Sequence, residues 1–360
     1  MIKKQVEVAL LQEKDIDELL VFYNRLYNEN RTREKFTWEF FNAPAGKALY
    51  VIARDGETGS IIGSQCAIPI ELVTAEGTVV LTAKSEDTLV DPNYRGQNIF
   101  EKMYQLLFDI CRQQGIKYLW GFTSAKKPFL KLGFEIPFDH SQSLLVTNVF
   151  EAYRYLSTLN PGNKLPEKLK ILSLCFFSAL RALKIQQAKL PKHFSVNLSD
   201  KNDFYYDNEK TMPGTAGFRI RQHAAYMDWR IAKNPYHKEI FSINFSEGEK
   251  AKASLVFNHH KNGAWYLIND NYHEQFSLKQ KTVLHRIALK QLCSRKKVSL
   301  IRTWDFSHNS FGCEEIALRK KAGYIHLEKG ISFVWKKLDE TAPLNPADFN
   351  LSRLASQGTI

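Results

Sequence analysis

The chain is organised around the run Val90-Asp91-Pro92-Asn93-Tyr94-Arg95-Gly96-Gln97-Asn98-Ile99-Phe100. Proline removes a ladder hydrogen-bond donor, so Asp91-Pro92 should end a strand. The apolar residues that follow recur at spacings of four, three and four, which predicts a helix with one inner face formed by Ile99, Met103, Leu106 and Ile110. The run therefore predicts a strand that ends in a glycine-containing turn and leads directly into a helix.

This turn has the features of an anion-binding site. Backbone N–H groups in the first turn of a helix have no partner within the helix, and the helix dipole favours negative charge there. Arg95 adds a positive charge at the same point, and Gly96 allows the backbone to approach a bulky ligand. The alternative is an ordinary strand–turn–helix connection that binds no ligand.

Two motifs in this region resemble those of the GNAT acyltransferase family. In that family the loop Arg/Gln-x-x-Gly-x-Gly/Ala holds the pyrophosphate of acetyl-CoA. Here the frame begins at Arg95, with Asn98 and Phe100 in place of the two pattern glycines. The segment 125–134 resembles the second motif of the family. Many members have a tyrosine there as proton donor to the departing thiolate, and the matching residue is Phe129, which cannot donate a proton.

Periodicity and turn signals across the first half of the chain predict the order β-α-α-β-β-β-α-β-α-β. This order is typical of a mixed-sheet α/β domain, and it is also the order that the resemblance implies. The expected strands are 6–11, 49–54, 60–73, 79–90, 117–123 and one beginning at Phe134. The expected helices are 15–28, 34–42, one opened by 95–98 with its inner face at 99–110, and 125–132.

The rest of the chain reads as a second copy of the same domain. Trp229 followed by Asn234-Pro235 matches Trp38 followed by Asn42-Ala43-Pro44, and similar strand and helix patterns come after each. Between Asp270 and Ser277 the second copy has neither glycine nor arginine to bind a phosphate. We therefore expect two tandem GNAT-like mixed-sheet α/β domains, the second degenerate, with one cofactor site. The whole chain resembles tandem-GNAT acetyltransferases of bacteria.

The expected domain boundaries follow from these patterns. Residues 1–147 form the N-terminal domain, 148–217 a linker, 218–340 the degenerate domain and 341–360 a C-terminal tail. The linker contains a basic amphipathic helix with an uncharged centre at 171–180, too short to span a bilayer. We expect this helix to dock on the body of the protein. Peripheral membrane contact through 166–190 is the alternative.

Bulk composition narrows the class of protein. With 360 residues, 44% hydrophobic and 24% charged side chains, the chain is long enough for two globular domains. Its net charge of +12 suits an anionic ligand, a membrane surface or nucleic acid, and we expect no nucleic-acid partner. Five cysteines without C-x-x-C spacing, histidines without a metal pattern and an N-terminus without a long apolar region predict a cytoplasmic protein with no disulfide framework and no metal.

The resemblance also implies a set of site residues. Acetyl-CoA, or another acyl-CoA, would be the co-substrate. Its binding residues would be Thr88, Leu89, Val90, Arg95, Gly96, Gln97, Asn98, Ile99, Phe100 and Ser124. The candidate general base is Glu86 or Asp87; strand alternation sends their side chains to opposite faces, so only one should reach the site. Thr123 and Ser124 could instead cap the next helix.

These features together favour an acyl-CoA-dependent N-acyltransferase. It would transfer an acyl group, most simply acetyl, from the CoA thioester to the amine of a small molecule or amino sugar by direct attack. Two alternatives remain from the residues alone: a catalytically inactive GNAT-fold binding protein, and a transferase that uses another acyl donor such as aminoacyl-tRNA.

Overall fold

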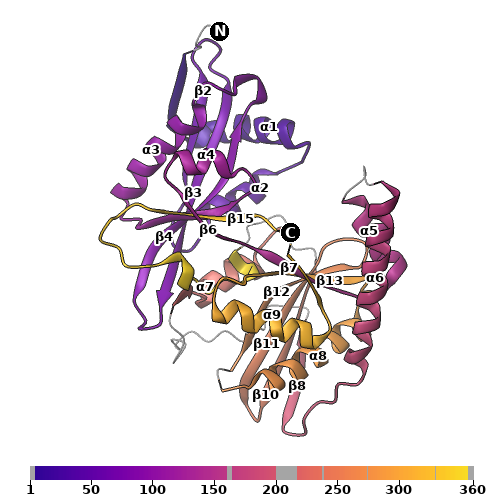
Figure 1. Ribbon diagram of the computed structural model, residues 1–360. Coiled ribbons are helices and arrows are strands. Elements are labelled where there is room, and N and C mark those ends of the chain that lie inside the picture. The colour runs from indigo at the N-terminus through magenta and orange to yellow at the C-terminus, as the bar shows by residue number, and fades with distance from the viewer. Residues whose placement is uncertain are drawn as a thin grey trace. The chain divides into compact units, whose positions relative to one another are not determined.

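A computed structural model describes residues 5–159, 164–199, 217–236, 239–273, 275–328 and 330–355. The chain forms two compact units, each assembled from segments that are distant in sequence. Unit 1 comprises Met1–Asp139, Ala216–Arg221 and Ile331–Phe349, and unit 2 comprises His140–Thr215, Gln222–Gly330 and Asn350–Ile360. Each unit is built on its own mixed sheet (Figure 1).

Unit 1 has the predicted element order. Its elements are β1 (Val6–Leu10), α1 (Ile16–Tyr27), α2 (Arg33–Phe36), β2 (Leu49–Asp55), β3 (Ile61–Thr74), β4 (Val79–Val90), α3 (Ile99–Gln113), β5 (Tyr118–Thr123), α4 (Lys126–Lys131) and β6 (Glu135–Asp139). The sheet order is β1-β2-β3-β4-β5-β15-β6, where β15 is Ser332–Lys337 and the short β9 (Phe218–Ile220) pairs with β3. The predicted α/β class is confirmed.

Helix α3 is held by its apolar face. Ile99 and Met103 are buried as predicted, together with Tyr104, Leu107 and Cys111. The predicted Leu106 and Ile110 lie at the edge of the same core and are only partly buried. Burial of such side chains, at about 1.5–3 kcal/mol each, fixes the helix against the sheet and so fixes the position of its N-terminus.

Unit 2 repeats this plan. Its elements are β7 (Ser141–Val146), α5 (Val149–Thr158), α6 (Leu165–Gln186), β8 (Phe194–Ser199), α7 (Ala224–Met227), β10 (Ile240–Glu247), β11 (Lys250–His259), β12 (Ala264–Tyr272), α8 (Leu278–Arg295), β13 (Leu300–Asp305), α9 (Ser310–Ala322) and β14 (Ile325–Leu327). The sheet order is β14-β7-β13-β12-β11-β10-β8.

The two units exchange one strand each. β7 follows β6 after a single residue, yet it pairs with β13 and β14 in unit 2. β15, near the C-terminus, pairs with β5 and β6 in unit 1. Figure 1 shows the exchange by colour, with yellow β15 among the indigo and magenta strands of unit 1. The structure therefore divides the chain differently from the expected contiguous domains 1–147 and 218–340, because an interior strand of each sheet comes from the other half of the sequence.

The expected linker and tail are largely built into the units. Within 148–217, helices α5 and α6 pack against β7 of unit 2, and β8 is the edge strand of its sheet. Within 341–360, Phe349 is buried and stacks on Phe218 with ring centroids 4.7 Å apart, and Leu354 is also buried. Residues 160–163, 200–216 and 356–360 of these two segments lie outside the described residues.

Two local features recur in both units and support the predicted duplication. Trp38 and Trp229 each lie second in a five-residue π-helical turn, Thr37–Phe41 and Asp228–Ala232. β4 carries a β-bulge at Asp87-Thr88 opposite Gln65, and β12 carries one at Ile268 opposite the Val256–Phe257 step. A bulge is a specific local distortion, so its recurrence at the same strand of both sheets indicates a shared architecture.

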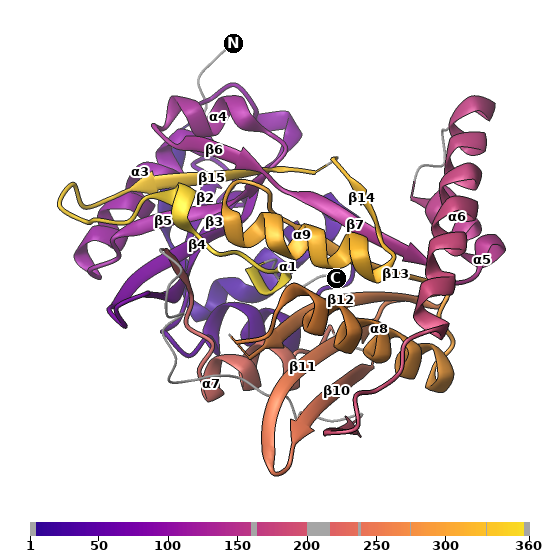
Figure 2. The ribbon, with the colours of Figure 1, turned by 60° about the horizontal axis from the view of Figure 1, so that its bottom comes forward.

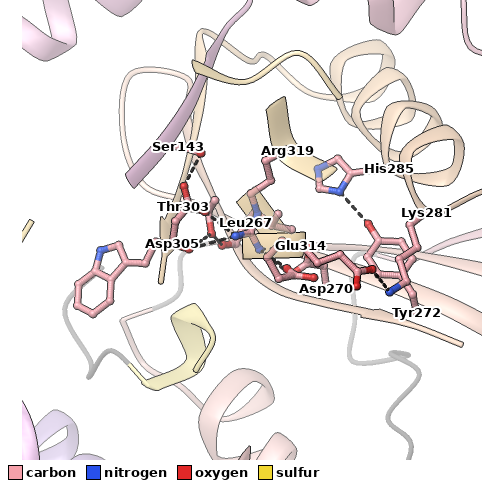
Figure 3. A network of polar contacts seen from close by, with 12 residues as sticks. Ser143, Leu267, Asp270, Tyr272, Lys281, His285, Thr303, Asp305, Glu314 and Arg319 are labelled. Carbon is pink, nitrogen blue, oxygen red and sulfur yellow. Dashed lines mark hydrogen bonds and ion pairs between the residues drawn. The ribbon is translucent and has the colours of Figure 1, made fainter. Parts of the chain in front are cut away.

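In unit 2, a buried ionic cluster joins the two strands that correspond to β4 and β5. β12 and β13 pair only from Ala264–Leu300 to Tyr266–Arg302 and then diverge. Arg319 on α9 bridges the divergence, with nitrogen–oxygen distances of 2.5 Å to Asp305 on β13 and 3.2 Å to Asp270 on β12 (Figure 3). Thr303 also donates to the carbonyl of Leu267 at 3.0 Å. Side chains of unit 2 therefore occupy the gap between the diverging ends of β12 and β13.

The Arg319 cluster should make the stability of unit 2 depend on pH. Glu315 lies 2.8 Å from Arg319, but burial, and then the negative charge of Asp270, raise its pKa to about 8. Between pH 4.5 and 8 the folded state therefore keeps a proton that the unfolded state has lost, so the unfolding free energy should fall as pH rises through this range. The effect is about 1.4 kcal/mol per unit of pKa difference.

We expect Glu315→Gln to remove this pH dependence, because the amide mimics the neutral acid. The variant should gain stability over the natural sequence at pH 8.5 more than at pH 5 in urea unfolding at ~25 °C. Glu314→Gln is the matched control: Glu314 is exposed and pairs with Lys281 at 2.7 Å, so its loss should change stability by less than about 1 kcal/mol at either pH. Equal profiles for the natural protein and Glu315→Gln would contradict the assignment.

Candidate functional site

The loop after β4 is anchored at both ends. The Asp91 carboxylate accepts from the backbone N–H of Asn93 at 2.9 Å and from Arg25 at 2.9 Å, which ends the strand at the predicted place. A 3-10 turn, Pro92–Tyr94, follows, and the Tyr94 hydroxyl donates to Asp55 on β2 at 2.5 Å. The chain therefore enters α3 from a fixed direction.

The entrance to α3 has an unusual backbone. Gly96 and Asn98 have φ values of +79° and +58°, and Asn98, which precedes the first residue of the helix, makes no side-chain capping hydrogen bond. A Cβ atom on Gly96 would meet nothing within 4 Å, so glycine serves the positive φ rather than a tight space. The corresponding helix α8 in unit 2 has a capping box formed by Ser277 and Gln280, so the first-turn N–H of Gln280 has a side-chain partner there, whereas α3 has no side-chain cap.

Side-chain burial around this entrance matches an open helix end. Arg95, Gly96 and Asn98 are exposed, Gln97 and Phe100 are partly buried, and Ile99 is buried in the core. The predicted loop residues are thus brought together at the start of α3, with Arg95 four residues before the first residue of the helix. A positive dipole end and a nearby exposed cation both favour a bound anion.

β4 and β5 diverge just before this loop. The two parallel strands pair only at Ala83–Leu119 and Lys84–Trp120 among the described residues. β5 remains paired with β15 along its whole length, so the divergence belongs to β4 and β5 alone. At the branch point, a Cβ atom on Gly121 would lie 2.8 Å from the carbonyl oxygen of Ser85, so only glycine fits. From Glu86 to Val90, β4 therefore has one edge in the ladder with β3 and the other edge facing away from any strand described.

The bulge on β4 is stabilised by a buried ion pair. Asp87 has φ +55°, an uncommon value for a residue with a side chain. Its carboxylate accepts from Arg31 at 2.8 Å and from the hydroxyl of Tyr50, and the side chains of Asp87 and Arg31 are each 5% exposed. Arg31 also lies 3.8 Å from Glu39. Asp87 is thus engaged in holding the strand.

Glu86 has a different environment. Its side chain is 28% exposed and forms an ion pair with the buried Lys84. Tyr50, Cys66 and Glu86 are partners in register across β2, β3 and β4 and so share one face of the sheet. Asp87 accepts from the Tyr50 hydroxyl, so its carboxylate lies on the same face as Glu86. The alternation expected from an ideal strand is therefore wrong here, because the bulge turns Asp87 out of the regular pleat.

Glu39 is a buried acid that the sequence did not single out. Burial raises its pKa to about 7, Arg31 opposes this, and Asp87 adds to it. One guanidinium is thus shared by two carboxylates in this part of unit 1. Trp38-Glu39 lies in a short apolar helix, and an acid on the buried face of such a helix is the signal that could have pointed to it.

Polar residues also line the other face of β4. Ser85 shares a hydrogen bond of 2.6 Å with the hydroxyl of Tyr104 on α3 and accepts from Gln65 on β3 at 3.0 Å. Thr88 donates to the same Gln65 side chain. Burial raises the pKa of Tyr104, so its hydroxyl stays protonated as a donor. Tyr104 was read from the sequence only as part of a helix, because its aromatic ring fits an apolar face.

The remaining predicted residues divide into two groups. Phe129 is buried and packs against Phe100 and Phe134, with ring centroids 5.4 Å and 5.1 Å apart, so an aromatic core fills the position of the family's acid. Ser124 is exposed just after β5, and Thr123 accepts from the backbone N–H of Ala125 at 3.0 Å. Neither caps α4, whose N-cap residue is Ala125 and which has no side-chain cap. No cluster of three or more metal-ligating side chains occurs in the described ranges.

Comparison with known proteins agrees with this geometry. An acetyltransferase (GNAT) domain model matches residues 7–136. No curated protein matches the chain by sequence.

Three solved structures illustrate the fold. A protein from Enterococcus faecalis V583 described as a probable N-acyltransferase has TM-score 0.61 and 11% identity, covering 93% of this chain and 73% of that one. A tandem GNAT protein of the clavulanic acid biosynthesis pathway has TM-score 0.57 and 12% identity, covering 94% and 100%. Saccharomyces cerevisiae N-myristoyltransferase has TM-score 0.58 and 14% identity, covering 97% and 84%.

Such low identities establish a shared fold and nothing about substrates. The family match falls on the half of the chain that carries the open helix end and the diverging strands, whereas unit 2 closes the same place with Arg319. Residues 7–136 therefore match the acetyltransferase (GNAT) domain model, and the chain as a whole shares the fold of a tandem GNAT protein, with the second unit a degenerate copy of that fold.

Proposed function

We propose that unit 1 is an acyl-CoA-dependent N-acyltransferase that acylates the amine of a small molecule, with an amino sugar as one fitting class of acceptor. The proposal rests mainly on two features that follow each other along the chain. β5 pairs with only the first part of β4, so the rest of that edge of β4 has no partner strand among those described. From there one anchored loop leads to the N-terminus of α3, which has no side-chain cap. Acyl-CoA carries its thioester at one end of an extended arm and a diphosphate at the other end of that arm. Its binding site therefore needs a strand edge that can form hydrogen bonds with the arm, followed by an anion site for the diphosphate.

In this proposal CoA is bound mainly by the backbone. The N–H groups of Gln97, Asn98, Ile99 and Phe100 would bind the diphosphate, and Arg95 would add a charge-assisted contact. The pantetheine arm would lie along Thr88, Leu89 and Val90, whose amide groups on the β5 side could pair with its own amides. Ser124 and Gly96 would line the two ends of the site. Glycine is not needed at position 98 for a positive φ, since Asn98 already adopts the left-handed conformation, and Phe100 lies within α3, where φ is negative.

The chemistry requires a neutral amine, because an ammonium has no lone pair to attack the thioester carbonyl. Glu86 would accept the proton, since it is part-exposed and is paired with Lys84 alone, whereas the less exposed Asp87 is held by both Arg31 and Tyr50. The amine nitrogen bonds to the carbonyl carbon, a backbone N–H of β4 stabilises the oxyanion, and the carbon–sulfur bond then breaks. The thiolate can leave without a proton donor from the protein, because the anion of a thiol with pKa ~8.5 is only weakly basic, and it then takes a proton from water.

A second function is favoured by one observation. Phe129 fills the position of the family's proton donor with an apolar ring, which a binding protein that retained CoA but lost catalysis would tolerate. Such a protein would bind CoA and turn over no amine. A transferase that uses aminoacyl-tRNA would instead bind tRNA and not CoA, and a gel shift distinguishes the two.

Arg95→Ala should weaken CoA binding at least tenfold while leaving the fold intact. Arg95 is exposed, so its loss removes a charge-assisted contact of about 1.5–3 kcal/mol and little packing. We expect acetyl-CoA to raise the melting temperature of the natural protein, with most of the shift absent in the variant. The control is Arg112→Ala, an exposed arginine at the far end of the same helix that pairs with Asp109 at 3.0 Å, and it should keep the full shift. No shift by any CoA ligand in the natural protein would refute the cofactor assignment.

Substitutions of the two adjacent carboxylates, Glu86 and Asp87, should affect catalysis and stability to different degrees. Glu86→Gln should lower kcat/KM by about 10²–10⁴, because it removes a proton acceptor. It should lower the melting temperature less than Asp87→Asn, because the side chain of Glu86 is 28% exposed and that of Asp87 is 5% exposed. Asp87→Asn should instead destabilise the protein by about 3 kcal/mol, because it leaves Arg31 buried beside a neutral group. Acetyl transfer across an amine panel and thermal unfolding measure the two effects. If Asp87→Asn were stable but inactive, the roles would be the reverse.

A further inference from the structure

Helix α6 is docked on unit 2 along one side only. Cys175, Ser178 and Ile185 are buried, and the Ser178 hydroxyl accepts from the backbone N–H of Val146 on β7 at 2.9 Å. Arg181 donates to the carbonyl of Lys320 at 3.2 Å. The expected docking therefore occurs, and it fixes which side of the helix faces the body. In both views α6 lies beside α5 at the edge of unit 2 (Figures 1 and 2).

The opposite side of α6 is an exposed apolar stripe. Its residues recur at spacings of four, three, four, four and three, so they form one continuous row along a helix of 22 residues, about 33 Å long. Their exposed fractions run from 38% to 70%, in the order Leu165 70%, Leu169 55%, Leu172 38%, Phe176 54%, Leu180 48% and Leu183 62%. Phe177 beside the stripe is 62% exposed, and Phe150 on the neighbouring α5 is 80% exposed.

A row of this length is unusual on a surface that faces only water. Single exposed apolar residues are common, but contiguous apolar patches generally mark a binding surface for another molecule. None of the helices in the described ranges is long and apolar enough to cross a bilayer. A surface helix with one side docked on its domain can still present its other side to a membrane interface.

Basic side chains flank the stripe on both sides. At 100° per residue the apolar row covers an arc of roughly 80°, with Lys168 about 40° beyond one border and Lys184 about 40° beyond the other. Lys170 and Arg181 lie further round, and Glu167 is the one acidic residue of the helix. Lysines at such borders can extend their ammonium groups to lipid phosphates while their methylene chains lie along the apolar surface.

We propose that the stripe of α6 binds the surface of an anionic membrane, with the helix lying in the plane of the interface. Charge decides between this occupant and a second copy of the chain. Pairing two copies through the stripe would place four cations of each helix close to those of the other, with a single acid on each, whereas anionic lipid headgroups attract all of them. The net charge of the whole chain, +12, is also positive and would likewise favour an anionic membrane surface. This inference does not depend on the acyltransferase proposal.

Vesicle flotation with the full chain tests the proposal. We expect at least tenfold more protein to float with phosphatidylcholine vesicles that contain phosphatidylglycerol than with phosphatidylcholine alone, and we expect high salt to reduce this preference. Phe176→Ser with Leu180→Ser should lower binding to the anionic vesicles at least tenfold. Lys168→Gln with Lys184→Gln should remove the lipid preference while leaving weak binding to both vesicle types.

The control removes equally exposed apolar groups elsewhere. Val21→Ser with Leu130→Ser changes side chains in unit 1 that are 69% and 53% exposed, and it should leave flotation unchanged. Circular-dichroism melting checks that each variant folds. Absence of flotation of the natural protein with anionic vesicles overturns the proposal, as does equal flotation of the stripe variant. A dimer in sedimentation that Phe176→Ser with Leu180→Ser dissociates, without vesicle binding, would assign the stripe to self-association instead.

Discussion

The buried ion pair between Asp87 and Arg31 is the interaction on which the N-terminal site depends. A non-glycine residue at positive φ is strained by roughly 1–2 kcal/mol, and a carboxylate buried without a partner costs more. Arg31 and the Tyr50 hydroxyl offset both costs. The bulge that results lies where β4 turns away from β5, and the free edge of β4 leads from there to α3. Without this pair, the regular pleat would extend, and Glu86 and Asp87 would point to opposite faces.

The second unit shows what the same frame becomes without such a site. It keeps the bulge on β12 and the divergence from β13, but Arg319 joins the diverging strands and Ser277 caps the following helix. The absence of glycine and arginine between Asp270 and Ser277 predicted the missing loop. The sequence could not predict Arg319, because its partners Asp270 and Asp305 come from two different strands and meet only in the folded unit.

Local sequence patterns predicted most of the strands and helices of unit 1. They did not predict that each sheet takes a strand from a distant part of the sequence, so the structure divides the chain differently from the expected domain boundaries. Proline at 92, glycine at 96 and the apolar stripe of α3 depend on neighbouring residues, so the strand, turn and helix were placed correctly. Local patterns do not show which sheet β7 or β15 joins, because their pairing partners are distant in sequence. The Arg31–Asp87 contact spans 56 residues and was likewise invisible in sequence. The positions proposed to bind CoA remain predictions from one motif.

The reciprocal strand exchange limits how this protein can be divided. A break in the chain near residue 147 would leave the first sheet without the strand that separates β5 from β6, and the second fragment would carry β15 with no sheet to join. Both fragments would then present unpaired backbone in their interiors, a template for aggregation. Each unit thus completes the sheet of the other, so unit 2 must be retained for as long as unit 1 is needed.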